Sequence, residues 1–210
     1  MDICASENKG LFDTCRVVPV VVIKDISDTV PTLSAMRDGG IPVAEITFRT
    51  ACAAEAIRLG RQSLPDMNIG AGTVINSEQA TLAIDCGAQF IVSPGFSKSV
   101  ARICLDRGVP YLPGCVTPAE IMAALDMGIT TVKFFPANVY GGLGAIRALS
   151  APFPQIMFLP TGGIDMSNIK DYLLCDRVVA VGGSFMMKGS CDDIRKNCKE
   201  LSEFLSNLNG

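Results

Sequence analysis

The chain has 210 residues, with 18 basic and 21 acidic side chains, a net charge of −3 and a sequence pI of about 5.0. This charge balance and the absence of a basic run argue against a nucleic-acid-binding surface. No apolar stretch approaches the roughly 18 residues of a membrane span. The mean hydropathy of +0.36 nevertheless predicts that part of the surface is buried against another subunit.

The first segment of the chain, residues 1–16, is interrupted by charges at Asp2, Glu7, Lys9, Asp13 and Arg16. A signal peptide needs a continuous apolar region, so this segment does not fit one. It predicts a short N-terminal helix that covers one end of the domain.

Two residue types narrow the chemistry before any motif is considered. Histidine is absent, which excludes histidine-based nucleophile pairs and histidine zinc sites. The nine cysteines include no C-x-x-C pair and predict reduced thiols in a cytoplasmic protein. They are Cys4, Cys15, Cys52, Cys86, Cys104, Cys115, Cys175, Cys191 and Cys198.

Beyond residue 16, short β-prone segments recur roughly every 25 residues, with helical patterns between them. The predicted strands are 17–23, 43–48, 68–73, 90–94, 111–115, 131–136, 157–161 and 178–182. The predicted helices between them include 28–38, 51–63, 76–86, 97–107, 117–127 and 142–149.

The ends of these predicted helices carry capping signals. Asn76, Ser97 and Thr117 stand at helix starts, and Glu120 follows Thr117 at the spacing of a capping box. Glycines at the predicted helix ends are Gly39, Gly87, Gly108 and Gly128. Strands that are apolar on both faces indicate a parallel sheet covered by helices. We therefore predict one domain, a (β/α)8 barrel over 17–188 followed by a C-terminal helix over 189–210, with a doubly wound sheet as the alternative.

Polar residues gather where the predicted strands end, the place where barrels carry catalytic groups. In the second strand Glu45, Thr47 and Arg49 share one face by strand alternation. In the sixth strand the same rule puts Lys133 and Phe135 together. A carboxylate, a guanidinium and an amine are therefore expected to project into the same space.

Glycine-rich turns follow three of the strands. Gly70-Ala71-Gly72-Thr73 ends the third, Thr161-Gly162-Gly163 the seventh and Gly182-Gly183-Ser184 the eighth. Turns after the last two strands of a barrel commonly bind phosphate through exposed backbone N–H groups. The alternative explanation for each glycine pair is that it ends the strand and allows a turn, with no role in binding.

The segment Thr131-Val132-Lys133-Phe134-Phe135-Pro136 places a lysine among apolar residues. A buried ammonium is costly, and the lysine can avoid that cost by losing its proton. The resulting neutral amine is a nucleophile for ketones. The alternatives are a lysine that reaches solvent or one that is paired for structure alone.

Other candidates have structural explanations as well. Glu45 and Arg49 form either a catalytic group or a structural ion pair inside the barrel. Thr73 and Thr161 either contact a ligand or cap the helices that follow them. Packing is the simpler role for Phe135. Aspartates such as Asp165 show no metal-ligand spacing and are expected in loops and caps.

Taken together, six motifs in order resemble the KDPG/KHG aldolase family over roughly residues 16–188. They are Glu45-x-x-x-Arg49, Gly70-Ala71-Gly72-Thr73, Ser93-Pro94-Gly95, Lys133-Phe134-Phe135-Pro136, Thr161-Gly162-Gly163-Ile164 and Gly182-Gly183-Ser184. The resemblance implies a (β/α)8 barrel, a homotrimer and metal-free Schiff-base cleavage of 2-keto-3-deoxy-6-phosphogluconate to pyruvate and glyceraldehyde 3-phosphate. It implies no cofactor.

The same resemblance implies a role for each matching residue. Lys133 forms the Schiff base and Glu45 is the general acid and base. The implied substrate-binding residues are Arg49, Thr73, Pro94, Phe135 and Thr161. The implied phosphate-binding residues are Gly162, Gly163, Gly182, Gly183 and Ser184. Two features depart from the family, namely Phe185 in place of a tryptophan and the stretch 189–210, and both bear on substrate preference.

Two other functions remain open at this stage. A sugar-phosphate isomerase or epimerase on the same barrel would use Glu45 and the phosphate turns without an imine. A non-catalytic binder of phosphorylated metabolites would keep the fold without turnover. Within the aldolase interpretation, the galactonate epimer and 4-hydroxy-2-oxoglutarate, which would yield pyruvate and glyoxylate, are possible further substrates.

Overall fold

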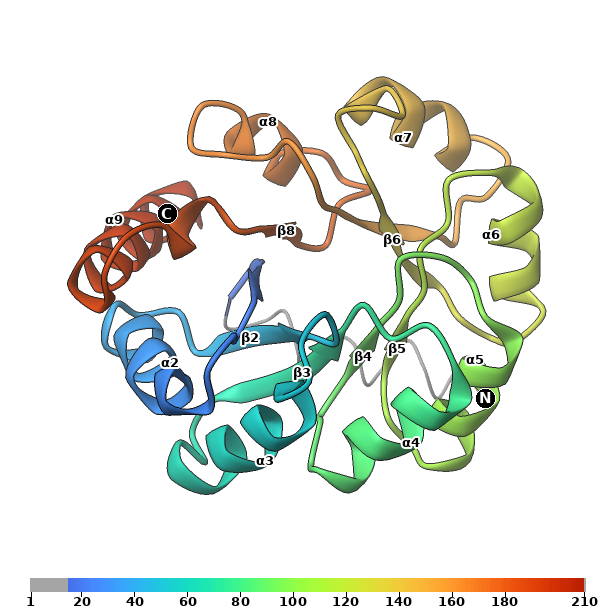
Figure 1. Ribbon diagram of the computed structural model, residues 1–210. Coiled ribbons are helices and arrows are strands. Elements are labelled where there is room, and N and C mark those ends of the chain that lie inside the picture. Colours follow the sequence, from blue (N-terminus) through green and yellow to red (C-terminus); the bar gives the residue numbers. More distant parts are fainter. Residues whose placement is uncertain (1–14, 210) are drawn as a thin grey trace.

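The computed structural model of the chain describes residues 15–209 (Figure 1). The helix predicted over 1–16 lies outside this range except for Cys15 and Arg16, which are not helical. Across the described range, no helix combines the length and the apolar character that crossing a bilayer requires.

Within residues 15–209, eight strands, all paired in parallel, form the interior of the domain. They are β1 (Val17–Val21), β2 (Val43–Thr47), β3 (Asn68–Gly72), β4 (Ile91–Val92), β5 (Tyr111–Leu112), β6 (Thr131–Phe134), β7 (Met157–Pro160) and β8 (Val181–Gly183). Six of them form one sheet in the order β5-β4-β3-β2-β1-β8, and β6 pairs with β7. Single bridges join Gly114 to Lys133 and Thr161 to Gly182.

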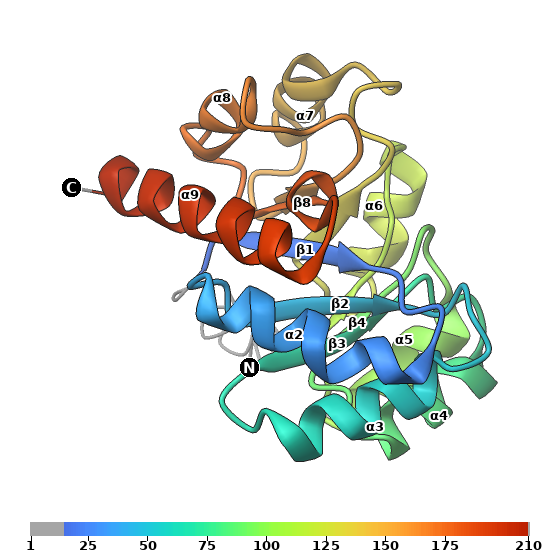
Figure 2. The ribbon, with the colours of Figure 1, turned by 60° about the vertical axis from the view of Figure 1, so that its left-hand side comes forward.

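The helices lie outside the strands, as Figures 1 and 2 show. The α-helices are α2 (Thr29–Asp38), α3 (Ala53–Ser63), α4 (Ser77–Asp85), α5 (Lys98–Asp106), α6 (Pro118–Leu125), α7 (Gly142–Ser150), α8 (Ile169–Leu173) and α9 (Cys191–Asn209). The described part of the chain also contains the short 3₁₀ helices η1 (Ile26–Asp28) and η2 (Phe185–Met187). The expected α/β alternation with a parallel sheet is therefore confirmed.

The strands are apolar on both faces because both faces are covered. Every residue of β1 and β2 is buried, including Glu45. Between β6 and β7, the rings of Phe134 and Phe158 meet edge to face with their centroids 6.1 Å apart. The position of a charged residue in such an interior is unusual enough to indicate a function.

The predicted helix starts agree with the structure. The side chains of Asn76, Ser97 and Thr117 each accept a backbone N–H bond from the first turn of their helices. Thr117 and Glu120 complete a capping box. At the end of α2, by contrast, the left-handed residue is Gly40, with φ 84°, while Gly39 has φ −80°. Gly39 is needed for a different reason, since a Cβ there would overlap Cys198 of α9.

The eighth strand begins later than its sequence predicts, at Val181 in place of residue 178. The guanidinium of Arg16 donates hydrogen bonds to the carbonyl groups of Val178 and Val179, at 2.8 and 3.1 Å. These carbonyls are satisfied by a side chain, so the segment pairs with β1 only from Val181 onward, while Val178 forms a single bridge with Phe158 of β7. The shift leaves Gly182 and Gly183 inside the strand.

Candidate active site

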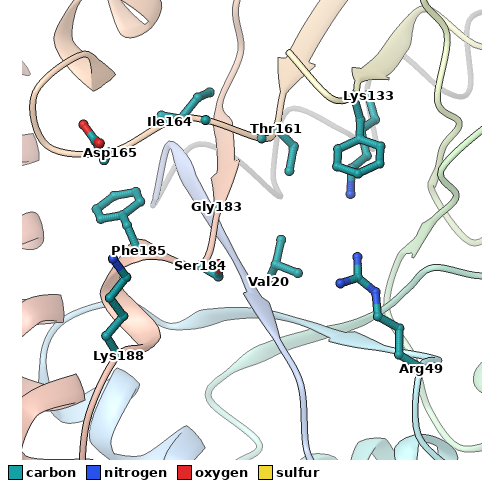
Figure 3. Close-up of a pocket in the computed structure, with 13 residues that line it drawn as sticks. Val20, Arg49, Lys133, Thr161, Ile164, Asp165, Gly183, Ser184, Phe185 and Lys188 are labelled. Carbon is teal, nitrogen blue, oxygen red and sulfur yellow. The ribbon is translucent and has the colours of Figure 1, made fainter. Parts of the chain in front are cut away.

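A cavity of about 350 Å³ opens at the ends of β1, β6, β7 and β8 (Figure 3). Its lining includes Arg49, Lys133, Phe135 and Thr161, all predicted from the sequence to contact substrate. The turns after β7 and β8 line it as well. The cavity therefore brings together side chains from segments that are more than a hundred residues apart.

Lys133 is buried in the floor of this cavity against Glu45. Its Nζ donates to the two carboxylate oxygens of Glu45 at 3.2 and 3.4 Å. The side chains are 7% and 0% exposed, so the pair is shielded from water. The ammonium also lies 5.4 Å from the centroid of the Phe135 ring. The lysine that we expected to be either nucleophilic, solvent-reaching or paired is buried beside a group that can accept its proton.

The neighbouring strands leave room for the Glu45 carboxylate. Glu45 pairs with Val20 of β1 and with Gly70 of β3, which fixes its depth in the sheet. A Cβ on Gly72 would overlap the carboxylate. Glycine at the end of β3 is therefore required by the close approach of a buried charged side chain.

Arg49 follows β2 and reaches the cavity from the opposite side (Figure 3). Its Nε donates to the Thr73 hydroxyl at 3.1 Å, and Thr73 has a left-handed backbone with φ 56°. Glu45 forms its ion pair with Lys133, so the alternative of a structural Glu45–Arg49 pair is wrong. The guanidinium has no carboxylate partner within residues 15–209 and presents its remaining N–H groups toward the cavity.

Thr161 directly follows β7 and lines the cavity between Lys133 and the glycine turns (Figure 3). Its hydroxyl is buried and has no hydrogen-bond partner among the described residues. A helix-capping role for Thr161 is therefore absent. A buried hydroxyl without a hydrogen-bond partner costs about 1–3 kcal/mol of stability. We therefore expect a ligand to form a hydrogen bond with it.

The phosphate turns predicted after β7 and β8 meet at the other end of the cavity. Gly162 and Gly163 have φ values of 98° and 73°. These positive values are backbone conformations that residues other than glycine rarely adopt. Gly183 and Ser184 line the same space. The N–H groups of Gly163 and Ser184 bond to no group of residues 15–209. Such free amides suit an anion.

Four predicted site residues are not part of the cavity lining. Two of them, Glu45 and Thr73, bond to the lining residues Lys133 and Arg49. Gly182 is buried behind Thr161, and Pro94 is exposed after β4, where its carbonyl packs against Gly114. Their predicted contacts with substrate stay predictions. The cavity also includes residues that sequence reasoning did not assign to it, namely Val20, Ile164, Asp165 and Lys188. No motif marked Lys188, because it follows the last glycine turn by four residues.

Other reactive groups near the site have other roles. Cys115 follows β5, and its N–H bonds to the Lys133 carbonyl at 2.9 Å. Burial raises the pKa of its thiol to about 12, so it is not a thiolate nucleophile at neutral pH. Asp165 accepts a bond from the Ser167 N–H at 2.8 Å, which is the loop role expected for it. Within the described residues, no three cysteine, aspartate or glutamate side chains form a metal-binding cluster.

Comparisons with known proteins give a consistent picture. The family model described as KDPG and KHG aldolase matches residues 9–201. The chain is 48% identical to 2-dehydro-3-deoxy-phosphogluconate aldolase of Treponema pallidum over 176 residues, which is 84% of each protein.

Two solved structures are also similar to it. A KDPG aldolase from Legionella pneumophila, with pyruvate captured at low pH as a covalent carbinolamine intermediate, is 37% identical with a TM-score of 0.88, covering 91% of this chain and 96% of that one. The 2-keto-3-deoxy-6-phosphogluconate aldolase of Zymomonas mobilis ZM4 with 3-phosphoglycerate is 36% identical with a TM-score of 0.90, covering 96% and 97%.

The contact between Gly182 and Thr161 generates a stability prediction. Gly182→Ala should destabilise the protein by about 1–3 kcal/mol, because the new methyl group overlaps the buried hydroxyl. The additional substitution Thr161→Ala removes that overlap and should recover part of the loss. Urea denaturation of both variants and of the single variant Thr161→Ala measures the coupling.

Gly95→Ala is the matched control, since a Cβ at Gly95 meets no atom within 4 Å. It should leave the free energy of unfolding nearly unchanged. A Gly182→Ala protein as stable as the Gly95→Ala protein would contradict the packing described.

Proposed function

The chain belongs to the KDPG and KHG aldolase family, and we propose that it cleaves 2-dehydro-3-deoxy-6-phosphogluconate to pyruvate and glyceraldehyde 3-phosphate through a Schiff base on Lys133. The observation that carries the proposal is the buried Lys133–Glu45 pair facing a cavity with cationic and amide groups at its two ends. The Legionella relative captured pyruvate as a carbinolamine, the first covalent adduct of this type of reaction.

Lys133 supplies the nucleophile. In the resting pair the ammonium bonds to Glu45, and transfer of one proton to that carboxylate leaves a neutral amine. The amine nitrogen adds to the substrate C2 carbonyl carbon, and the carbonyl oxygen takes up a proton to give a carbinolamine. Loss of that oxygen as water gives the protonated imine, whose positive nitrogen accepts electrons when the C3–C4 bond breaks.

Glu45 serves the proton transfers around the imine. It donates the proton that leaves with water, then accepts the C4 hydroxyl proton as that oxygen becomes the aldehyde. The C3–C4 bond electrons become the enamine, which is protonated at C3, and hydrolysis of the resulting imine releases pyruvate. Both carboxylate oxygens of Glu45 lie within hydrogen-bond distance of the Lys133 nitrogen, so small movements suffice for these proton transfers.

Arg49 and Thr161 orient the substrate on either side of Lys133. The guanidinium suits the C1 carboxylate because it can bind both oxygens in one plane. Thr73 holds it by accepting the Nε–H bond. The unpartnered hydroxyl of Thr161 lies between Lys133 and the phosphate end, where the substrate's own hydroxyl groups would pass (Figure 3).

The glycine turns bind the phosphate in this proposal. The free amides of Gly163 and Ser184 donate to it, and Gly162 and Gly183 allow close approach. A phosphorylated acid, 3-phosphoglycerate, is present in the Zymomonas structure, which supports an anion at this type of site. Gly182 acts indirectly, by leaving space for the Thr161 hydroxyl.

Three broader features belong to the same proposal. We take the bridges at Gly114–Lys133 and Thr161–Gly182 as support for a closed (β/α)8 barrel that forms one domain. Family membership and exposed apolar residues such as Val139 and Tyr140 support a homotrimer. The cysteines of residues 15–209 form no disulfides, in keeping with a cytoplasmic enzyme.

The two competing functions explain less of the site. An isomerase or epimerase has no need of a lysine buried next to its acid–base carboxylate. A binding protein without turnover would have no reason to keep that costly pair in the floor of the cavity.

A coupled assay for released pyruvate tests the proposed function. The protein should release pyruvate from 2-dehydro-3-deoxy-6-phosphogluconate without added cofactor. Lys133→Arg keeps the positive charge but cannot form an imine with a ketone, so turnover should fall by orders of magnitude. Absence of pyruvate from a folded wild-type protein would contradict the proposal.

Substitutions of Glu45 and Arg49 should separate proton transfer from binding. Glu45→Gln keeps the shape but not the basicity, so kcat should drop by about 10²–10⁴-fold with pyruvate still bound. Arg49→Ala should mainly raise KM for the keto acid, because a charge-assisted contact with its carboxylate is lost. Steady-state kinetics of both variants distinguishes the two roles.

Thermal melts are the control for these variants. Removing one partner of a buried pair costs about 3–5 kcal/mol, so Glu45→Gln is expected to lower Tm. If the folded fraction of Glu45→Gln kept normal kinetics, the Lys133–Glu45 pair would be structural and the chemistry would lie elsewhere.

A further inference from the structure

The end of the cavity opposite Lys133 contains an unassigned pair of charges. Lys188 and Asp165 both line it, on either side of Phe185 (Figure 3). Neither residue belongs to a motif that the proposed function uses. Their position beside Ser184 and the glycine turns puts both charges next to the proposed phosphate subsite.

The backbone of Lys188 is held in place. It follows η2 directly, and its carbonyl accepts a hydrogen bond from the Asn197 side chain of α9 at 3.3 Å. The same amide donates to the Met186 carbonyl at 3.2 Å. The root of the lysine is therefore anchored by the C-terminal helix, while its ammonium makes no ion pair within 4.0 Å among residues 15–209.

Asp165 carries a negative charge at the same place. Hydrogen bonds from the Ser167 hydroxyl and backbone N–H lower the pKa of its carboxyl group, and the nearby charge of Lys188 lowers it further. Asp165 is therefore ionised at neutral pH. By itself this carboxylate would repel a phosphate dianion.

The other groups at this end are neutral, being backbone amides, the Ser184 hydroxyl and the Phe185 ring. With Lys188 present, the charges of this end sum to zero before a ligand arrives. Without it, a dianion would enter beside an uncompensated carboxylate. Among the residues that line this end of the cavity, Lys188 is the one that carries a positive charge, which favours a dianion there.

We propose that Lys188 binds the terminal phosphate of the substrate and sets the preference for the phosphorylated keto acid over the same acid without its phosphate. This rests on the proposed aldolase function. Arg49 then receives the carboxylate at one end of the cavity and Lys188 the phosphate at the other, with Lys133 nearer the carboxylate (Figure 3).

The test compares kcat/KM for 2-dehydro-3-deoxy-6-phosphogluconate and for unphosphorylated 2-dehydro-3-deoxygluconate. Lys188→Gln should lower the ratio of the two values about tenfold, because one charge-assisted contact with phosphate is lost. Most of that change should appear in KM for the phosphorylated substrate. Lys188→Arg should recover most of the preference, since it restores the charge.

A second variant separates charge from structure. Asp165→Asn keeps an oxygen for the Ser167 hydrogen bonds but removes the repelling charge. Combined with Lys188→Gln, it should return part of the lost preference. Lys98→Gln is the matched control, because Lys98 is exposed at the start of α5 and is not part of the cavity lining; it should leave the ratio unchanged.

The possible outcomes separate failure of the Lys188 proposal from failure of the proposed aldolase function. If wild-type protein releases no pyruvate from either substrate, the proposed function fails. If wild-type protein is active and Lys188→Gln keeps the wild-type ratio, Lys188 is a surface lysine and the inference is wrong. A fall in kcat for both substrates alike would equally overturn it, because that pattern reports general damage to the site.

Discussion

A lysine and a glutamate buried in contact are the constraint around which this domain is built. Lys133 and Glu45 come from strands 88 residues apart in sequence, and neither side chain has meaningful access to water. Such a pair contributes little net stability, because desolvation offsets much of its attraction. Its retention in the floor of a cavity therefore indicates chemistry, and it requires the surrounding residues to accommodate two polar groups in an apolar interior.

The space that these buried polar groups need explains why glycine stands at two positions next to them. Gly72 admits the Glu45 carboxylate, and Gly182 admits the Thr161 hydroxyl. The parallel register brings the ends of the strands to one edge, where Arg49 and the turns after β7 and β8 face each other across the cavity. A substrate with an anion at each end fits this arrangement, because its carbonyl carbon would then lie beside the buried amine.

Much of this arrangement follows from local sequence signals, and some of it does not. The strand and helix order, the capping by Thr117 and the turn at Gly162 and Gly163 depend on short-range patterns, so they were predictable. The late start of β8 depends on Arg16, more than 160 residues away, which no local pattern reports. Glu45 pairs with Lys133 and not with Arg49 because of how distant strands pack, which a local pattern does not report either. Lys188 was missed because the Asn197 contact that anchors it comes from a helix outside every motif.

The central claim is that Lys133 is the imine-forming residue, and reductive trapping measures this directly. The protein is incubated with pyruvate and sodium borohydride, its intact mass is recorded, and the modified peptide is sequenced by mass spectrometry. One reduced pyruvate adduct per chain on Lys133, absent when borohydride or pyruvate is omitted, is the predicted result. A stable adduct on another lysine such as Lys24 or Lys98, or no adduct at all from a folded and active protein, would contradict the account.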